Sequence, residues 1–83
     1  MIRLLRTAAV IAANGCAKST LYALIAQGLW TKPVKLSKHA SAWPDYESDA
    51  LNAARIAGKS KEEIRALVKE LHAARTADRE VNQ

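Results

Sequence analysis

The sequence predicts a mainly α-helical fold with one small β-hairpin, and three observations lead to that prediction. Apolar residues recur at helical spacing in four stretches of the chain. The stretch after Gly28 instead alternates apolar and polar residues around a polar tip, as a two-stranded hairpin does. The 83 residues, 49% hydrophobic and 25% charged, have the composition of one small folded unit.

The chain opens with a short apolar run and a first helix. Residues 2–5 suit an edge strand, because the run is apolar but brief. Thr7 can cap a helix over residues 8–13, and the pair Asn14-Gly15 ends that helix, since both residues tolerate positive φ. The sequence therefore predicts a helix of about two turns that stops at a tight turn.

A second helix is expected over residues 17–28. Its buried side is marked by positions i, i+3, i+4 and i+7, the last of which ends the helix: Leu21, Leu24, Ile25 and Gly28. Two short helices joined by a turn that contains a glycine are typical of a helix-turn-helix, whose second helix can lie in the major groove of DNA. Its outward face carries small side chains, with a lysine, a threonine and a tyrosine at the margins: Ser19, Ala23, Ala26, Lys18, Thr20 and Tyr22.

This outward face suits contact with DNA. Small residues let a helix approach base edges closely, hydroxyls can bond to bases or phosphates, and a lysine can pair with phosphate. We therefore expect five residues of the helix to contact DNA: Lys18, Ser19, Thr20, Tyr22 and Ala23. The same composition would also suit an alanine-rich helix that reflects propensity alone, or a face buried against another chain, and both alternatives stay open.

The segment after Gly28 predicts a hairpin with its polar tip at residues 37–39, because Val34 and Leu36 alternate with Lys35 before it. Trp30 is expected to anchor the core, since large aromatic side chains dominate burial in a small protein. A hairpin that follows a recognition helix is a wing, which makes the fold a winged helix-turn-helix. The wing and its flank supply the expected phosphate contacts: Lys32, Lys35, Lys38 and His39.

A third helix is expected from Pro44 to about Ala57, with Gly58 as its end. Proline suits the first turn of a helix, and three acidic residues lie near the positive end of the helix dipole: Asp45, Glu47 and Asp49. We expect the inner face of this helix to pack over Trp43 and the helix-turn-helix through Tyr46, Ala50 and Leu51.

The last helix is expected over residues 61–77, with a frayed tail at residues 78–83. Ser60 and Glu63 have the spacing of a capping box. An apolar stripe follows at helical spacing: Ile64, Leu67, Val68, Leu71 and Ala74. Two interpretations stay open, because the stripe can pack on its own chain or join a partner helix in an oligomer through Ile64, Leu67, Val68 and Leu71.

Charge is distributed unevenly along the chain, whose net charge is +5. Residues 1–43 carry six basic and no acidic residues, whereas residues 44–83 carry seven basic and eight acidic residues. A cationic half that also contains a core pattern suggests a polyanionic partner, double-stranded DNA first, although a solvated surface would give the same count. We therefore divide the chain into a winged helix-turn-helix DNA-binding unit, residues 1–58, and a C-terminal helix and tail, residues 59–83.

The sequence offers little for catalysis. It has no glycine-rich phosphate loop, metal-ligand cluster or plausible triad, and the single Cys16, which cannot form an internal disulfide, fits a small turn residue in a reduced compartment. The apolar run at residues 7–13 is short for a signal peptide, and no segment approaches the ~20 apolar residues of a membrane span. We expect no enzymatic activity, no cofactor, no metal site, no membrane contact and a cytoplasmic, nucleoid-associated protein.

Residues 3–57 resemble the AlpA family of small phage and prophage regulators, whose members are similar to excisionases and to the winged domains of MerR-type regulators. The most specific segments are STLYALIAQG, KPVKL and Trp43. The resemblance implies a winged helix-turn-helix with recognition-helix and wing residues among those named above. Family members often have serine where Ala17 stands and basic residues where Ala23 and Ala26 stand. We therefore expect binding to rely on the wing and on several protomers at adjacent sites.

The expected function is sequence-specific DNA binding by a transcriptional regulator of a phage or mobile element. It would act as a homo-oligomer on DNA, with an integrase or RNA polymerase as candidate partners. One alternative is an excisionase that binds tandem sites beside an integrase and bends the DNA. A second is a protein-interaction module that antagonises another regulator, which predicts binding to a protein and no salt-dependent binding to DNA.

Overall fold

The computed structural model describes the backbone of residues 1–81 and the side chains of residues 1–76. Within that range, three strands and four helices follow one another as β1 (Leu4–Arg6), α1 (Thr7–Asn14), α2 (Lys18–Ala26), β2 (Val34–Ser37), β3 (Ala40–Pro44), α3 (Asp45–Ile56) and α4 (Lys61–Val81). The mainly helical fold with a small hairpin and an additional C-terminal helix is confirmed.

The three strands form one antiparallel sheet in the order β1-β3-β2. In β1, Leu5 lies opposite Trp43, so the N-terminal run is an edge strand as expected. β2 and β3 form the hairpin, hereafter the wing, and its turn consists of residues 38–39. The strand pairing is irregular between Lys35 and Ser37, just before that turn.

Two tryptophans form the centre of the core. Trp30 is 1% exposed and Trp43 is fully buried, as the sequence predicted for Trp30. The indole Nε1 of Trp43 donates a hydrogen bond of 2.8 Å to the carbonyl of Thr31, which ties the segment between α2 and β2 to the sheet. Apolar side chains from all four helices complete this core: Val10, Leu21, Leu51, Ile64 and Val68, together with Leu29.

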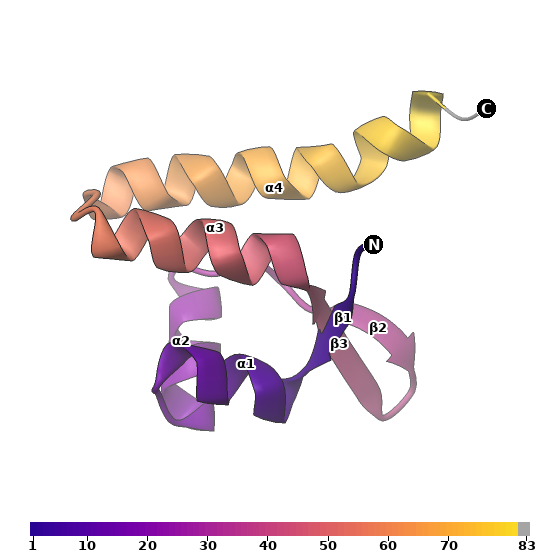
Figure 1. The fold of residues 1–83 in the computed structure, drawn as a ribbon, viewed down its shortest axis with the longest axis horizontal. Helices are drawn as coiled ribbons and strands as arrows, with labels where there is room; N and C mark the ends of the chain where they lie inside the picture. Colours follow the sequence, from indigo (N-terminus) through magenta and orange to yellow (C-terminus); the bar gives the residue numbers. More distant parts are fainter. Residues whose placement is uncertain (82–83) are drawn as a thin grey trace.

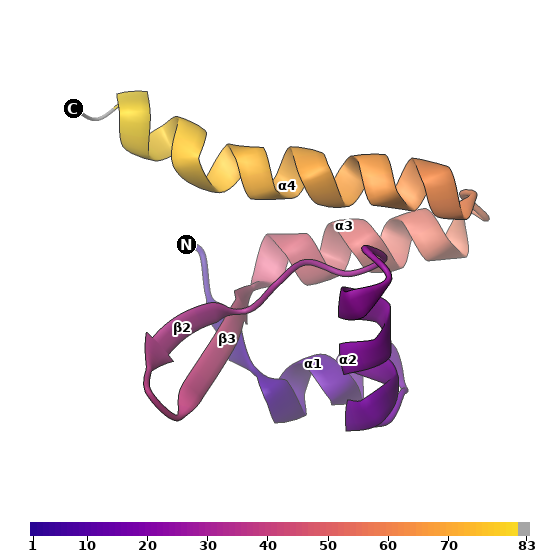
Figure 2. The ribbon, with the colours of Figure 1, turned by 180° about the vertical axis from the view of Figure 1, so that it is seen from behind.

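The longer helices cover the helix-turn-helix from one side. α3 and α4 run antiparallel beside each other, and α1, α2 and the wing lie below them in the view of Figure 1. Seen from behind, α2 and β2 both lie on the near side of the molecule, with α1 and β1 behind them and α4 along one edge (Figure 2). α2 and the wing therefore share one side of the molecule.

The expected helix ends are largely confirmed. α1 stops at Gly15, whose φ is +64°, and Gly28, with a φ of +75°, follows the last turn of α2. The Ser60 hydroxyl accepts the N–H of Glu63, and the Glu63 carboxylate accepts the N–H of Ser60, each at 3.2 Å. The pKa of Glu63 is lowered, chiefly because the ionised carboxylate accepts that backbone hydrogen bond from Ser60.

Two predictions about helix ends were wrong. Thr7 does not cap α1 but is its first residue, because the extended backbone of β1 leads directly into the helix and leaves Arg6 at the cap position. α4 continues to Val81 instead of ending at residue 77, since no glycine or proline interrupts it there. Residues 78–81 are therefore helical, and the rest of the expected frayed tail, residues 82–83, lies outside the described residues.

The inner face of α3 also differs from the prediction. Leu51 is fully buried as expected, but Tyr46 is 37% exposed and is not part of the buried cluster. Glu47 and Ser48 are buried in its place. The helix begins at Asp45, and its phase turns residues 47, 48 and 51 inward, which the sequence pattern had obscured because two of them are polar.

Candidate nucleic-acid interface

α2 has one buried side and one side in solvent. Leu21 is fully buried, and Leu24 and Ile25 pack against the core. The six outward residues are all exposed: Lys18, Ser19, Thr20, Tyr22, Ala23 and Ala26. The helical phase predicted for α2 is therefore confirmed, and its solvent face consists of small side chains together with Lys18 and Tyr22.

The first turn of α2 is open to an anion. Its N-cap residue Ala17 makes no side-chain capping bond, and among the described residues of that turn none is acidic. The first N–H groups of a helix lack intrahelical acceptors and carry the positive end of the helix dipole. Lys18, Ser19 and Thr20 thus surround a helix end with the chemistry that binds phosphate.

The wing carries a second group of polar residues away from the core. Lys35 lies in β2, Lys38 and His39 form the turn, and all three are exposed. Leu36 is 48% exposed as well, so the alternation seen in the sequence does not bury it. The reason is that this part of the hairpin extends past the two tryptophans that form the core.

Lys32 lies apart from the other wing residues. Its N–H donates a 3.0 Å hydrogen bond to Nε2 of His72, and its carbonyl accepts one of 2.8 Å from Nη2 of Arg75. These bonds hold its backbone against α4 at the root of the wing, although the residue is exposed. The structure therefore groups Lys35, Lys38 and His39 on the wing and leaves Lys32 beside α4.

Two arginines that the sequence pattern did not assign to the interface lie in or next to the same sheet. Arg6 is exposed in β1 opposite Ala42 of the wing, and Arg3, also exposed, accepts the N–H of Asp45 with its carbonyl at 2.8 Å. The charge count included both residues, but only the pairing of β1 with β3 brings them beside the wing.

An ion pair joins α3 and α4 behind the interface. The fully buried carboxylate of Glu47 accepts hydrogen bonds from Nε and Nη2 of Arg75 at 2.7 and 2.5 Å. From the sequence, Glu47 was expected only to interact favourably with the positive end of the helix dipole. Its position four residues before Leu51 was a signal that it shares the buried side of α3 and needs a cation there.

His72 lies beside this ion pair. Burial lowers the pKa of its imidazole, the charges of Arg75 and Lys32 lower it further, and the charge of Glu47 opposes them. A lowered pKa favours the neutral ring, which keeps Nε2 available as the acceptor that the Lys32 N–H needs. The sequence placed His72 only on a charged helix and gave no sign of this contact.

The stripe on α4 packs within the chain. Ile64 and Val68 belong to the buried core, and Leu67 and Leu71 are partly buried against it, whereas Ala74 is exposed. Of the two interpretations of the stripe, the structure shows packing on its own chain, because α3 lies directly beside α4. The chain itself therefore buries Ile64 and Val68 and covers Leu67 and Leu71 in part.

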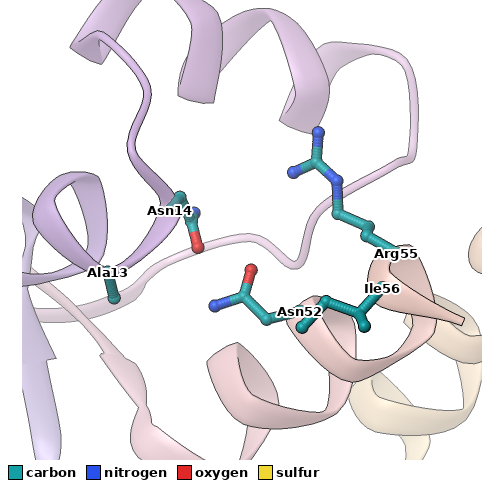
Figure 3. Close-up of a pocket in the computed structure, with 5 residues that line it drawn as sticks. All are labelled: Ala13, Asn14, Asn52, Arg55 and Ile56. Carbon is teal, nitrogen blue, oxygen red and sulfur yellow. The ribbon is translucent and has the colours of Figure 1, made fainter.

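A hollow of about 460 Å³ lies between the ends of α1 and α3 (Figure 3), lined by Ala13, Asn14, Asn52, Arg55 and Ile56. The amide nitrogen and oxygen of Asn14 are buried and make no hydrogen bond within the described residues. The Asn52 side chain points toward Asn14 in this view. The lining offers polar contacts through amides and a guanidinium, but it contains no nucleophile or acid–base pair for catalysis.

Metal-ligand clusters and membrane-spanning helices are both absent from the described part of the chain. Within it, no three His, Cys, Asp or Glu side chains are grouped as a metal ion would require. No single helix there is long and apolar enough to cross a membrane, and α1 and α2 reach that length and composition only together, with a bend of 91° between them. Cys16 is a free thiol that packs against the core.

The comparisons with known proteins concern the part of the chain that holds this interface. A model of the family described as prophage CP4-57 regulatory protein (AlpA) matches residues 3–50. That range runs from β1 into α3 and excludes α4. No curated protein and no solved structure matches the chain. The match covers more than half of the chain and confirms the resemblance seen in STLYALIAQG and KPVKL. The protein therefore belongs to the AlpA family of prophage regulatory proteins.

Proposed function

We propose that this protein is a transcriptional regulator that binds double-stranded DNA, with α2 in the major groove and the wing on the flanking backbone. The observation that carries the proposal is the absence of acidic residues from residues 1–43, which hold six basic residues and both exposed groups described above. A surface of one sign attracts a polyanion over a range of about 10 Å at moderate salt.

The two groups have different tasks in this proposal. Ser19, Thr20, Tyr22 and Ala23 face outward from the first two turns of α2, where hydroxyls and methyl groups can meet base edges. Four residues at the helix start and on the wing contact phosphates, which fixes the register of the protein without reading sequence: Lys18, Lys35, Lys38 and His39. The exposed side chain of Lys32 adds a cation at the wing root.

The helix-turn-helix supports this proposal through its backbone as well. The N-cap residues of α1 and α2, Arg6 and Ala17, make no side-chain capping bond, and within the described chain neither first turn contains an acid. Both helix ends can therefore donate backbone N–H groups to phosphates.

The test is binding to DNA from around the protein's own gene, measured at several salt concentrations and compared with random DNA. Lys35→Ala and Lys38→Ala are each expected to weaken binding to both DNAs equally and to reduce the salt slope by about one. Lys69→Ala removes the same charge from an exposed position of α4 and serves as the control. The proposal fails if the wing variants bind like the control.

The recognition helix is tested separately. Tyr22→Ala and Ser19→Ala are expected to reduce the preference for specific over random DNA, because they remove groups that face the bases. Equal losses on both DNAs would contradict a base-reading role for α2.

One observation favours the excisionase as a second candidate. Among its exposed residues α2 presents Lys18 as a cation but alanine at positions 23 and 26, so a single protomer has few phosphate contacts on this helix. Weak single sites favour several protomers on adjacent sites. A DNase footprint separates the cases: one short symmetric site at a promoter indicates a regulator, and an extended phased pattern beside an attachment site indicates an excisionase. No protection at low salt indicates the protein-interaction module.

A further inference from the structure

α4 contacts α2 and the wing, the two elements that the proposed function assigns to DNA. The contacts are at the C-terminal end of α2 and at the segment that leads into β2, hereafter the roots of the two elements. The helix lies outside the residues matched by the AlpA family, which end at residue 50. Its side chains bond to the C-terminal end of α2 and to the segment that leads into β2. Neither contact involves the outward face of α2 or the tip of the wing.

At the first of these roots, Arg65 holds the end of α2. Its Nε donates a 3.0 Å hydrogen bond to the carbonyl of Gln27, the C-cap residue of α2. Its aliphatic part lies along Gly28, where an added Cβ would meet Cγ of Arg65 at 3.7 Å. A cation at the C-terminal end of a helix is favourable because the helix dipole is negative there.

An apolar contact supports the same root. Leu24, near the end of α2, packs against the buried core. Leu29 and Ile64 also belong to the buried core. The end of α2 is therefore fixed to α4 by both a hydrogen bond and packing.

At the second root, α4 holds Lys32, two residues before β2 begins. His72 accepts its N–H and Arg75 donates to its carbonyl, so both backbone groups of this residue are engaged by one helix. Arg75 is itself held by its two hydrogen bonds to the buried Glu47. The start of the wing therefore has little freedom to move relative to α4.

The three contacts lie on one side of α4. Arg65, His72 and Arg75 are spaced i, i+7 and i+10, and ten residues of α-helix span about 15 Å. We propose that α4 is a rigid spacer that sets the separation and angle between α2 and the wing, with Arg65 and His72 as positioning residues that do not touch DNA. This inference rests on the proposed function, because a spacer matters only if both elements engage one duplex at once.

The first experiment compares Arg65→Ala with Lys69→Ala, which removes the same charge from the same helix. Thermal unfolding is measured first, and binding is measured where both variants are fully folded. Arg65→Ala is expected to lower affinity for specific DNA about tenfold, because two linked contacts lose their matched spacing. Its salt slope is expected to equal that of the control, since no phosphate contact is removed. Arg65→Lys keeps a charged donor and should restore most of the affinity.

A second measurement does not depend on DNA. Spin labels on Ala26→Cys and His39→Cys, in a Cys16→Ser background, report the distance between α2 and the wing. Arg65→Ala is expected to broaden that distance distribution, whereas Lys69→Ala leaves it unchanged.

Three results would overturn the spacer role. They are an unchanged affinity in Arg65→Ala, a salt slope that falls by about one as for a direct phosphate contact, and an unchanged distance distribution. If the wild-type protein binds no DNA at all, the proposed function fails, and the label distances still test the spacer on their own.

Discussion

The helix starts in the two halves of the chain differ in charge, because the first turns are acidic only in the second half, although α3 lacks a side-chain cap as α1 and α2 do. α1 and α2 begin without a side-chain cap and, within the described chain, without an acid in the first turn. The first turns of α3 and α4 are acidic, and α4 also has a capping box: Asp45 and Glu47, Glu62 and Glu63, and the Ser60–Glu63 pair. A helix start without a cap costs about 1 kcal/mol of stability. The starts of α1 and α2 are therefore the helix ends that the chain leaves open to an outside anion.

The largest effect on stability is expected from Arg75→Ala, which removes the partner of the buried Glu47 in the second half of the chain. The free energy of unfolding should fall by about 3 kcal/mol, because a buried carboxylate is left without its cation. Urea unfolding at neutral pH measures this loss. The double variant Glu47→Leu, Arg75→Leu should recover most of it, and a loss below about 1 kcal/mol in Arg75→Ala would contradict the structural role of the pair.

The next effect concerns DNA binding and compares the same added charge in each half. Ser19→Glu puts an acid into the first turn of α2, which suits the helix dipole but repels phosphate. Affinity for DNA should fall at least about tenfold, while thermal stability stays the same or rises. Ala66→Glu, at an exposed position of α4, is the matched control and should bind nearly as the wild type. Equal losses in both variants would mean that only net charge matters.

Adding a cap to α2 and removing the cap of α4 should change stability in opposite directions. Ala17→Ser adds a hydroxyl at the open cap of α2, and Ser60→Ala removes the hydroxyl that caps α4. Stability should rise by about 0.5 to 1 kcal/mol in the first variant and fall by about 1 kcal/mol in the second. Thermal unfolding followed by circular dichroism measures both. A loss of stability in Ala17→Ser would show that the start of α2 is unsuited to a side-chain cap.

The smallest effect is a pH dependence that arises from His72. Because its pKa is lowered in the folded protein, the unfolded chain takes up this proton at a higher pH than the folded one does. The contribution of His72 to stability is therefore complete above its usual pKa near 6.5 and is lost as the pH falls toward the lowered value. His72→Gln should flatten this part of the stability curve. A stability curve that His72→Gln leaves unchanged would contradict the assignment.

The placement of most candidate interface residues could be predicted from the sequence because it depends on local patterns. The phase of α2 follows from the spacing of Leu21, Leu24 and Ile25, and that spacing also names the residues on its exposed face. The capping box at Ser60 and the turn at Gly15 follow from neighbours within four residues. The wing followed from alternation, although Leu36 shows that alternation does not reveal which part of a hairpin reaches the core.

Local patterns could not predict which distant residues contact the apolar stripe of α4 or the polar side chains that bond between elements. Periodicity identified the stripe that includes Ile64 and Val68 but left open whether its own chain or another covers it. Glu47 and His72 looked like ordinary charged-helix residues, because their partners are distant in the sequence. The attachment of the Lys32 backbone to α4 has the same cause.

The sequence by itself determined the helices, the wing, the family and the uneven charge, since helical hydrogen bonds, caps and turns join residues a few positions apart. The tertiary structure alone decided how those parts are held in place. Arg75 meets Glu47 across 28 positions and Lys32 across 43, and Arg65 meets Gln27 across 38. Such contacts form only after the helices pack, because the core around Trp30 and Trp43 sets which side of α4 faces the rest of the molecule.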